Sequence, residues 1–219
     1  MNPAARHTLA AALMLATTTA SSAVILNDTS TGRYNDSIGT VLDTAGASDP
    51  FPCPVPVCGD DSVSYATAPN LDAASAALGN WLTDPAAPGG MWSAADQTIP
   101  LTWQVNTETA IIYQIDAASG LTNLQLQLGV DNGVFVWLDG VYQFGARAGG
   151  GVLLGEYNVS LPDLAAGTHY LQILREDHGG STGYAISLTG DAAAVPVPGT
   201  AALLGIGLLG LGITNRRRA

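Results

Sequence analysis

The feature that most constrains the fold is a strict alternation of apolar and polar side chains that begins at Leu121. Leu124, Leu126, Leu128 and Val130 fall on one face of an extended chain, and the residues between them fall on the other. An alternation with a period of two and one apolar face is typical of an antiparallel strand that is buried on one side and solvated on the other. We therefore expect a sheet.

Several other segments also have a strand pattern, and turn sequences lie between them. The expected strands are 111–115, 121–130, 134–138, 141–144, 157–161, 170–174 and 184–188. Asp139-Gly140 separates two of them and favours a tight hairpin, because such a turn needs positive φ. We also expect Asp131-Asn132-Gly133 to interrupt the alternation before it resumes at Val134. The pattern predicts an all-β fold, an antiparallel, jelly-roll-like β-sandwich.

The first half of the chain is less regular. Leu71, Ala74, Leu78 and Leu82 have helical spacing after the capping residue Asn70, so we expect one short helix that covers the edge of the sandwich. Prolines and glycines from Pro85 onward end it, and we expect 101–105 to re-enter the sheet.

The N-terminal residues 1–23 have the order of an export signal. Arg6 precedes an apolar run over 9–16, and small residues follow up to Ala23. We expect cleavage after Ala23, with Ala20 as the alternative. Residues 24–190 then form an extracytoplasmic domain.

The C-terminal residues 191–219 have the composition of a linker and a membrane anchor. No charged side chain occurs from Ala192 to Asn215, and Arg216, Arg217 and Arg218 follow. Pro198 limits a helix to 199–214, which is about 24 Å long, against about 30 Å of bilayer hydrocarbon. We expect a single transmembrane helix here, with the arginines on the cytoplasmic side.

The charge distribution excludes several classes of partner. The chain has no lysine, and residues 24–195 hold only Arg33, Arg147 and Arg175 against all 18 acidic residues. Such a surface repels phosphate backbones, so we expect no nucleic-acid partner. The absence of lysine also excludes Schiff-base catalysis.

The two cysteines, Cys53 and Cys58, flank a proline-rich loop. In an exported chain, oxidation is favoured. We expect a disulfide that stabilises the fold by about 2 kcal/mol. A catalytic thiol or half of a zinc site is the alternative.

The densest polar cluster of the body is Arg175-Glu176-Asp177-His178, where a strand ends. One interpretation is a ligand site at the rim of the sandwich, with Asp131, Asn132 and Asp139 as a second segment. Carboxylates suit calcium, so the candidate calcium ligands are Asp131, Asp139 and Asp177. The other interpretation is a solvated turn in which Arg175 pairs with a neighbouring acid. For Trp137, Tyr142 and Phe144 the alternatives are core packing and a platform for sugar stacking.

Two further patterns match catalytic or cofactor motifs only by letter. Gly179-Gly180-Ser181-Thr182-Gly183 has the nucleophile-elbow spacing, but a strand pattern follows it and no histidine occurs after His178. A dinucleotide-type glycine pattern at 205–210 lies within the anchor, with no acidic residue after it. We expect neither a serine hydrolase nor a dinucleotide site.

The C-terminal tail resembles the PEP-CTERM sorting tail. The resemblance rests on Val195-Pro196-Val197-Pro198, the glycine- and leucine-rich segment 201–212 and Arg216-Arg217-Arg218. It implies an exported protein of an exopolysaccharide-producing Gram-negative bacterium, with exosortase as processing partner, cleavage near Pro196 to Pro198, and release to the cell surface or matrix. The family usually has glutamate between the prolines, where this chain has Val197.

A second resemblance covers 111–190. The segments 130–141 and 164–171 are similar to the lectin-like β-sandwich of the protective-antigen type. This resemblance implies glycan binding, in some members through calcium held by paired aspartates. Asp131 is followed by Asn132 instead.

These observations favour a non-catalytic protein of the cell surface or extracellular matrix that binds exopolysaccharide or other glycans, without a cofactor other than the calcium considered above. One alternative is a secreted, glycan-active hydrolase, with Glu176 or Asp177 as acid or base and His178 assisting. Another is an adhesin that binds a protein.

Overall fold

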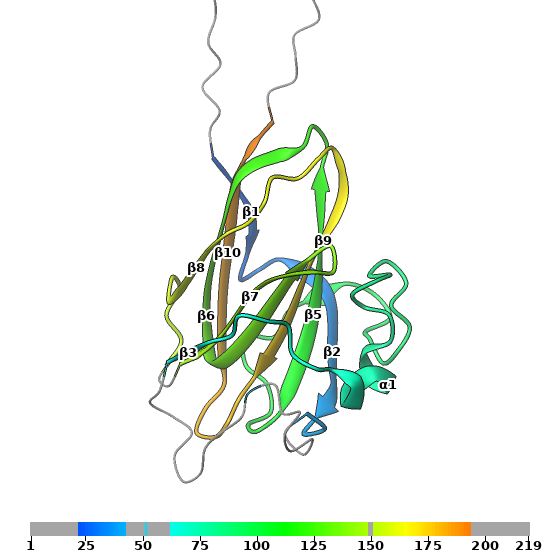
Figure 1. Cartoon of the computed structure of the whole chain (residues 1–219), viewed down its shortest axis with the longest axis vertical. Helices are drawn as coiled ribbons and strands as arrows, with labels where there is room; N and C mark the ends of the chain where they lie inside the picture. The colour runs from blue at the N-terminus through cyan, green and yellow to red at the C-terminus, as the bar shows by residue number, and fades with distance from the viewer. Residues whose placement is uncertain (1–21, 43–50, 52–61, 149–150, 194–219) are drawn as a thin grey trace, which may run out of the picture.

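The computed structural model describes residues 22–42, 51, 62–148 and 151–193. It is an antiparallel β structure with one short α-helix (Figure 1). The elements are β1 (Ala23–Asn27), β2 (Thr31–Gly39), β3 (Val63–Ser64), a 3₁₀ turn (Asp72–Ala74), α1 (Ser75–Leu78), β4 (Gln97–Thr98), β5 (Glu108–Ala117), β6 (Leu121–Leu138), β7 (Val141–Ala148), β8 (Tyr157–Ser160), β9 (Gly167–Glu176) and β10 (Gly183–Ala192).

The strands form one hydrogen-bonded network that curls into two facing sheets, because β6 belongs to both. The first half of β6 pairs with β10 and β8, and β10 pairs with β1; we call these strands sheet I. The second half of β6 pairs with β7 and β9, and the order continues through β5 and β2 to β4; we call these strands sheet II. The all-β, sandwich-like prediction is confirmed at this level, and the jelly-roll connectivity stays a prediction.

The space between the sheets is filled by the predicted apolar face. Leu124, Leu126, Leu128 and Val130 are all buried there, together with Ile173 of β9. The Asp139-Gly140 hairpin is also confirmed, since both residues have positive φ, 51° and 75°.

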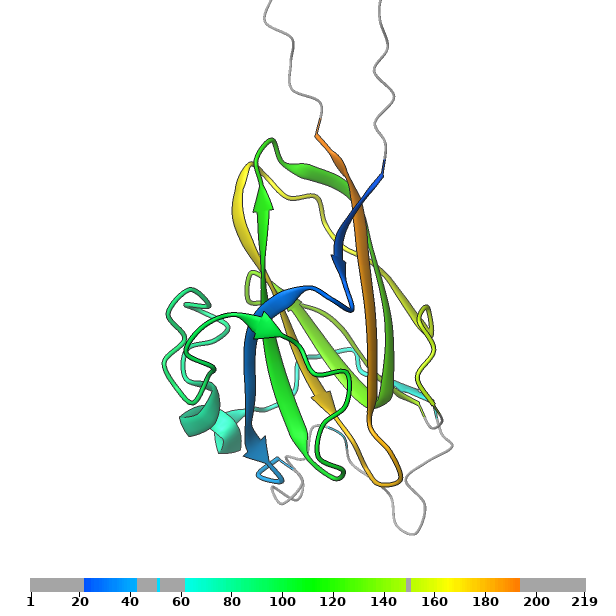
Figure 2. The same ribbon diagram turned by 180° about the vertical axis from the view of Figure 1, so that it is seen from behind.

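A second apolar layer covers the outer face of sheet II. Trp137 and Phe135 project from β6 into this layer, where Trp81 meets Trp137 edge-on at 5.2 Å between ring centroids. Trp137 is therefore a core residue. Figure 2 shows α1 and the loop after it against the same sheet, beside β2.

Three local predictions were wrong in part. Asp131-Asn132-Gly133 does not interrupt the chain but lies inside β6, where the strand passes from sheet I to sheet II. Residues 101–105 form no strand; β4 pairs with β2 instead. The helix ends at Leu78 and covers the face of sheet II, although Asn70 does accept a hydrogen bond from the Asp72 amide at 2.8 Å.

Candidate functional site

In the predicted ligand cluster at the end of β9, Arg175, Glu176 and Asp177 are buried and His178 is partly exposed. Arg175, Glu176 and Asp177 each have 0 % exposure, because neighbouring residues of a strand face opposite sides and both sides are covered here. A side chain without exposed surface cannot reach a sugar from solvent. The solvated-turn interpretation is equally inconsistent with this burial.

Arg175 lies between three aromatic rings of the interior. Its guanidinium carbon is 4.3 Å from the ring centroid of Trp103 and 4.7 Å from that of Tyr184, and its Nε donates to Thr109 Oγ1 at 2.8 Å. Burial lowers the pKa of Arg175, and the nearby tyrosines oppose that effect. Because a guanidinium is favourable over aromatic faces, Arg175 has a role in packing.

The loop from Asp177 to Ser181 is hydrogen-bonded to β6 and to Asn106. Asp177 Oδ2 accepts hydrogen bonds from the Asn106 and Gly179 amides, and Asn132 Oδ1 accepts one from the His178 amide at 2.8 Å. Ser181 Oγ donates to Asp131 Oδ2 at 3.3 Å. The serine of the nucleophile-elbow pattern is therefore one of the residues that hold this loop against β6. Burial and the neighbouring Asp177 raise the pKa of Asp131.

Asp139 lies apart from the other candidate calcium ligands. It lies in the turn between β6 and β7, and its carboxylate contacts β9, where it accepts a hydrogen bond from the Tyr170 amide and contacts His169 Nδ1. Tyr170 of β9 and Asp177, directly after β9, lie seven positions apart along an extended chain, or roughly 23 Å. Calcium ligands lie about 2.3–2.6 Å from the ion, so Asp139 cannot share an ion with Asp131 and Asp177. Among the described residues, no group of three or more metal-ligating side chains is present.

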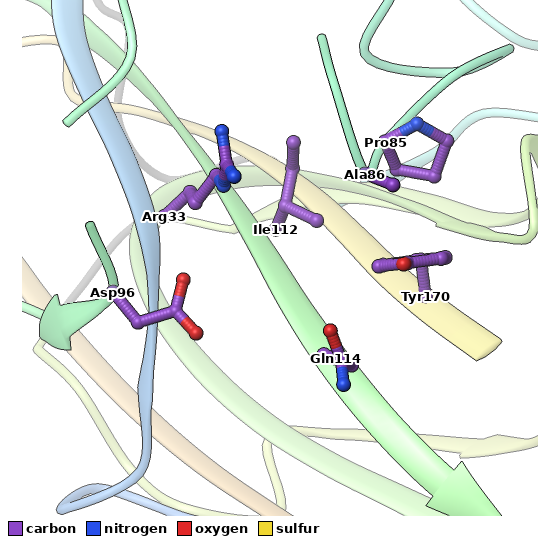
Figure 3. Close-up of a pocket in the computed structure, with 7 residues that line it drawn as sticks. All are labelled: Arg33, Pro85, Ala86, Asp96, Ile112, Gln114 and Tyr170. Carbon is purple, nitrogen blue, oxygen red and sulfur yellow. The ribbon is translucent and has the colours of Figure 1, made fainter. Parts of the chain in front are cut away.

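A polar pocket opens elsewhere, on the outer face of sheet II (Figure 3). Strand pairing aligns Arg33 of β2 with Ile112 of β5, and Gln114 of β5 with Tyr170 of β9. These four residues alternate with core residues, so they share the face that points away from sheet I. The strand period therefore places them together.

The rest of the pocket wall comes from two loops. Figure 3 shows Pro85 and Ala86 beside the Tyr170 ring, with Arg33 and the Asp96 carboxylate on the opposite side. The loop that contains Pro85 is held by hydrogen bonds from the Asp84 amide to Asn80 O and from the Ala87 amide to Asp84 O. The pocket volume is about 120 Å³. We call this the Arg33–Tyr170 pocket, lined by Arg33, Pro85, Ala86, Asp96, Ile112, Gln114 and Tyr170.

The polar groups of the pocket have unused hydrogen-bonding capacity. Within the described part of the chain, the side chains of Arg33 and Asp96 and the Tyr170 hydroxyl make no hydrogen bond or ion pair. Gln114 uses its amide nitrogen on Asp116, at 3.0 Å, and keeps its carbonyl oxygen available. A ligand here would meet donors, acceptors and one aromatic face.

Sequence reasoning missed this pocket because its residues come from five separate segments. The available signal was Arg33, an arginine in a chain with few cations, at the position where the strand pattern of β2 faces outward. Arg147 and Arg175, the other two arginines of the body, are buried.

The remaining predicted sites lie outside the described residues. These are the Cys53–Cys58 disulfide, the export signal up to residue 21, the sorting-signal residues Val195, Pro196, Val197 and Pro198, the helix over 199–214 and Arg216, Arg217 and Arg218. In the described part of the chain, no helix is long and apolar enough to span a membrane.

Comparison with known proteins identifies the tail. Residues 194–218 match the family model described as the PEP-CTERM protein-sorting motif. The motif supports an exported protein that exosortase processes, with a membrane-anchored intermediate before display at the cell surface. No curated protein and no solved structure matches the chain, so the resemblance to the protective-antigen-type sandwich is not confirmed.

Proposed function

We propose that this chain is a non-catalytic protein of the cell surface or extracellular matrix that binds a glycan chain, such as exopolysaccharide, in the Arg33–Tyr170 pocket. The observation that carries the proposal is the convergence of Arg33, Asp96, Gln114 and Tyr170 around the apolar floor of Ile112. The sorting motif supports delivery to a location where such polymers occur.

The chemistry of the pocket suits a sugar. Sugar hydroxyls can donate to the Asp96 carboxylate and accept from the Arg33 guanidinium, and hydrogen bonds to charged groups are stronger than neutral ones. The Tyr170 ring offers an apolar face to the C–H groups of a pyranose. The acidic body disfavours polyanions, so the glycan is neutral or weakly charged.

The size of the pocket limits how much of a glycan can enter it. About 120 Å³ is well below the roughly 300–1,000 Å³ of pockets that enclose drug-sized ligands. One sugar residue can enter while the rest of the chain stays in solvent.

Titration of the exported protein with neutral oligosaccharides and with exopolysaccharide from the producing organism tests the proposal. We expect Asp96→Asn to weaken binding about tenfold or more, because one hydrogen bond to a charged group contributes about 1.5–3 kcal/mol. Tyr170→Ala should also weaken binding, because it removes the aromatic face that the sugar packs on. Asp72→Asn, at an exposed aspartate outside the pocket, is the control and should bind as wild type does. Equal losses in the two aspartate variants would contradict the assignment of the pocket.

The same titrations separate binding from hydrolysis and from calcium dependence. Product analysis after long incubation should show an intact glycan, whereas turnover of the glycan by the wild-type protein would establish the hydrolase instead. Binding that requires calcium and is lost in Asp131→Ala would move the site to the β6–β9 region. Mass spectrometry of the released protein tests sorting: an intact Arg218 would show that the motif, with Val197 between its prolines, is not processed.

A further inference from the structure

The chain contains an acceptor sequence for asparagine-linked glycosylation, Asn-x-Ser/Thr, at three places. They are Asn27-Asp28-Thr29, Asn35-Asp36-Ser37 and Asn158-Val159-Ser160. The motif marks a surface asparagine of an exported protein, whose side-chain nitrogen a transferase must reach. The structure allows the three asparagines to be compared.

Asn35 and Asn158 have side-chain nitrogens that are already engaged. Asn35 has 1 % exposure and donates from Nδ2 to Ala77 O at 2.8 Å, beneath α1. Asn158 is exposed but donates from Nδ2 to Gly155 O at 2.7 Å. The hydroxyl that follows it, Ser160 Oγ, donates to Gln125 across the strand pair rather than to Asn158.

Asn27 lies at the start of an exposed turn between β1 and β2. Its Oδ1 accepts hydrogen bonds from the Thr29 amide at 2.9 Å and from Thr29 Oγ1 at 2.7 Å. Asn27 and Thr29 are both exposed, and within the described residues Asn27 Nδ2 makes no hydrogen bond. The amide oxygen is thus held by the threonine of the motif, and the nitrogen points to no partner.

Further hydrogen bonds attach the turn to its surroundings. The Asn27 amide donates to Ser30 Oγ at 2.9 Å, and Asp28 Oδ1 accepts from the Ile186 amide of β10 at 2.7 Å. β1 is an end strand of sheet I, so a group attached here extends from a sheet edge. A bulky group at an edge strand hinders pairing with another chain, and natural proteins need such protection at exposed edges.

We propose that Asn27 is a site of N-glycosylation. The bond that forms joins Asn27 Nδ2 to the anomeric carbon of a sugar donor activated through a phosphate, such as a lipid-linked oligosaccharide. The bond that breaks is the one between that carbon and the phosphate oxygen, which leaves with the bonding electrons. One Nδ2 proton passes to a base of the transferase, and the asparagine remains an amide.

Trypsin separates the three candidate sites, because it cleaves after Arg33 and Arg147, which lie between them. Asn27 lies on the peptide that ends at Arg33, Asn35 on 34–147 and Asn158 on 148–175. Peptide mass spectrometry of full-length protein, produced and exported in its own organism, should show the mass of one or more sugar residues on the first peptide. The other two peptides should be unmodified.

Matched variants identify the attachment atom. Asn27→Gln and Thr29→Val should both abolish the added mass, Thr29→Val being nearly isosteric without the hydroxyl. Thr29→Ser should keep it, and Asn158→Gln should leave it unchanged. An unmodified first peptide in wild type, or a glycan that persists in Asn27→Gln, would overturn the proposal. Binding in the Arg33–Tyr170 pocket is independent of either result.

Discussion

The hairpin between β6 and β7 is where a single added methyl group should be most informative. Gly140 has φ of 75°, and a Cβ there would overlap the carbonyl oxygen of Leu82, a backbone atom of the loop after α1. Gly39 has a similar φ of 61°, but its Cβ would meet no atom of the described residues within 4 Å. Gly39→Ala is therefore a control that shares the conformational cost and lacks the contact.

The magnitudes follow from these two effects. A non-glycine residue in the left-handed region costs about 1–2 kcal/mol, and both variants incur it. The overlap with Leu82 adds about 1–3 kcal/mol at Gly140 alone. The gain from a less flexible unfolded chain applies to both variants and cancels in their comparison. We expect Gly39→Ala to lose about 1–2 kcal/mol and Gly140→Ala about 2–5 kcal/mol.

Urea and thermal unfolding of the exported protein, followed by tryptophan fluorescence, measure this difference. For a domain of this size, 1 kcal/mol corresponds to about 2–4 °C, so Gly140→Ala should unfold about 2–12 °C below Gly39→Ala. Equal unfolding temperatures would show that the Leu82 loop yields freely. In that case the packing of the hairpin against the loop would not hold Pro85 and Ala86 at the pocket.

Three further predictions concern polar side chains, two in the interior and one at the surface. Gln172→Met should cost about 1–3 kcal/mol for each partner left unsatisfied, the Gly140 amide and Trp81 O, while Gln125→Met on the exposed face should stay within about 0.5 kcal/mol of wild type in urea unfolding. The hydrogen bond with Asp139 raises the pKa of His169 above the ordinary 6.5. The pair should therefore stabilise the fold fully at acidic pH and lose that effect as pH rises through the folded-state pKa. His169→Gln should make the melting temperature depend less on pH, and an unchanged pH profile would contradict the prediction. Arg175→Lys should lose at least about 2 kcal/mol in the same assay, because an ammonium cannot stack on Trp103 and Tyr184 as the planar guanidinium does; wild-type stability would contradict the packing role.

The parts of the fold that depend on local pattern were predictable. Alternation from Leu124 to Val130 set which face is buried, since a shift of one residue would expose every leucine. Asp139-Gly140 predicted its turn because few dipeptides adopt two consecutive positive φ angles. Each of these predictions needed only a few neighbouring residues.

Predictions that depended on distant partners failed. Asp131-Asn132-Gly133 has the composition of a turn, yet β7 pairs with Asn132 and Gly133, and β9 pairs with Gly133, so the segment stays in the strand. Gly133 fits there because the Phe51 ring occupies the space of a side chain. Arg175 to Asp177 read as a polar loop because the residues that bury them, such as Thr109 and Trp103, are more than 60 positions away.

The pairing of the first and last strands fixes where the chain enters and leaves the β-sandwich. Ala23 of β1 pairs with Gly190 of β10, and both ends leave the sandwich at the same pole (Figure 1). The last described contact, from the Ala193 amide to Gly120 O, is followed directly by the sorting motif at 194. A β-sandwich attached through either its N-terminal or its C-terminal strand is therefore held at the same end of the sandwich. The strands of sheet II run along the length of the sandwich (Figure 1), so the Arg33–Tyr170 pocket, which lies on their outer face, is at the side of the sandwich and not at the end where β1 begins and β10 ends.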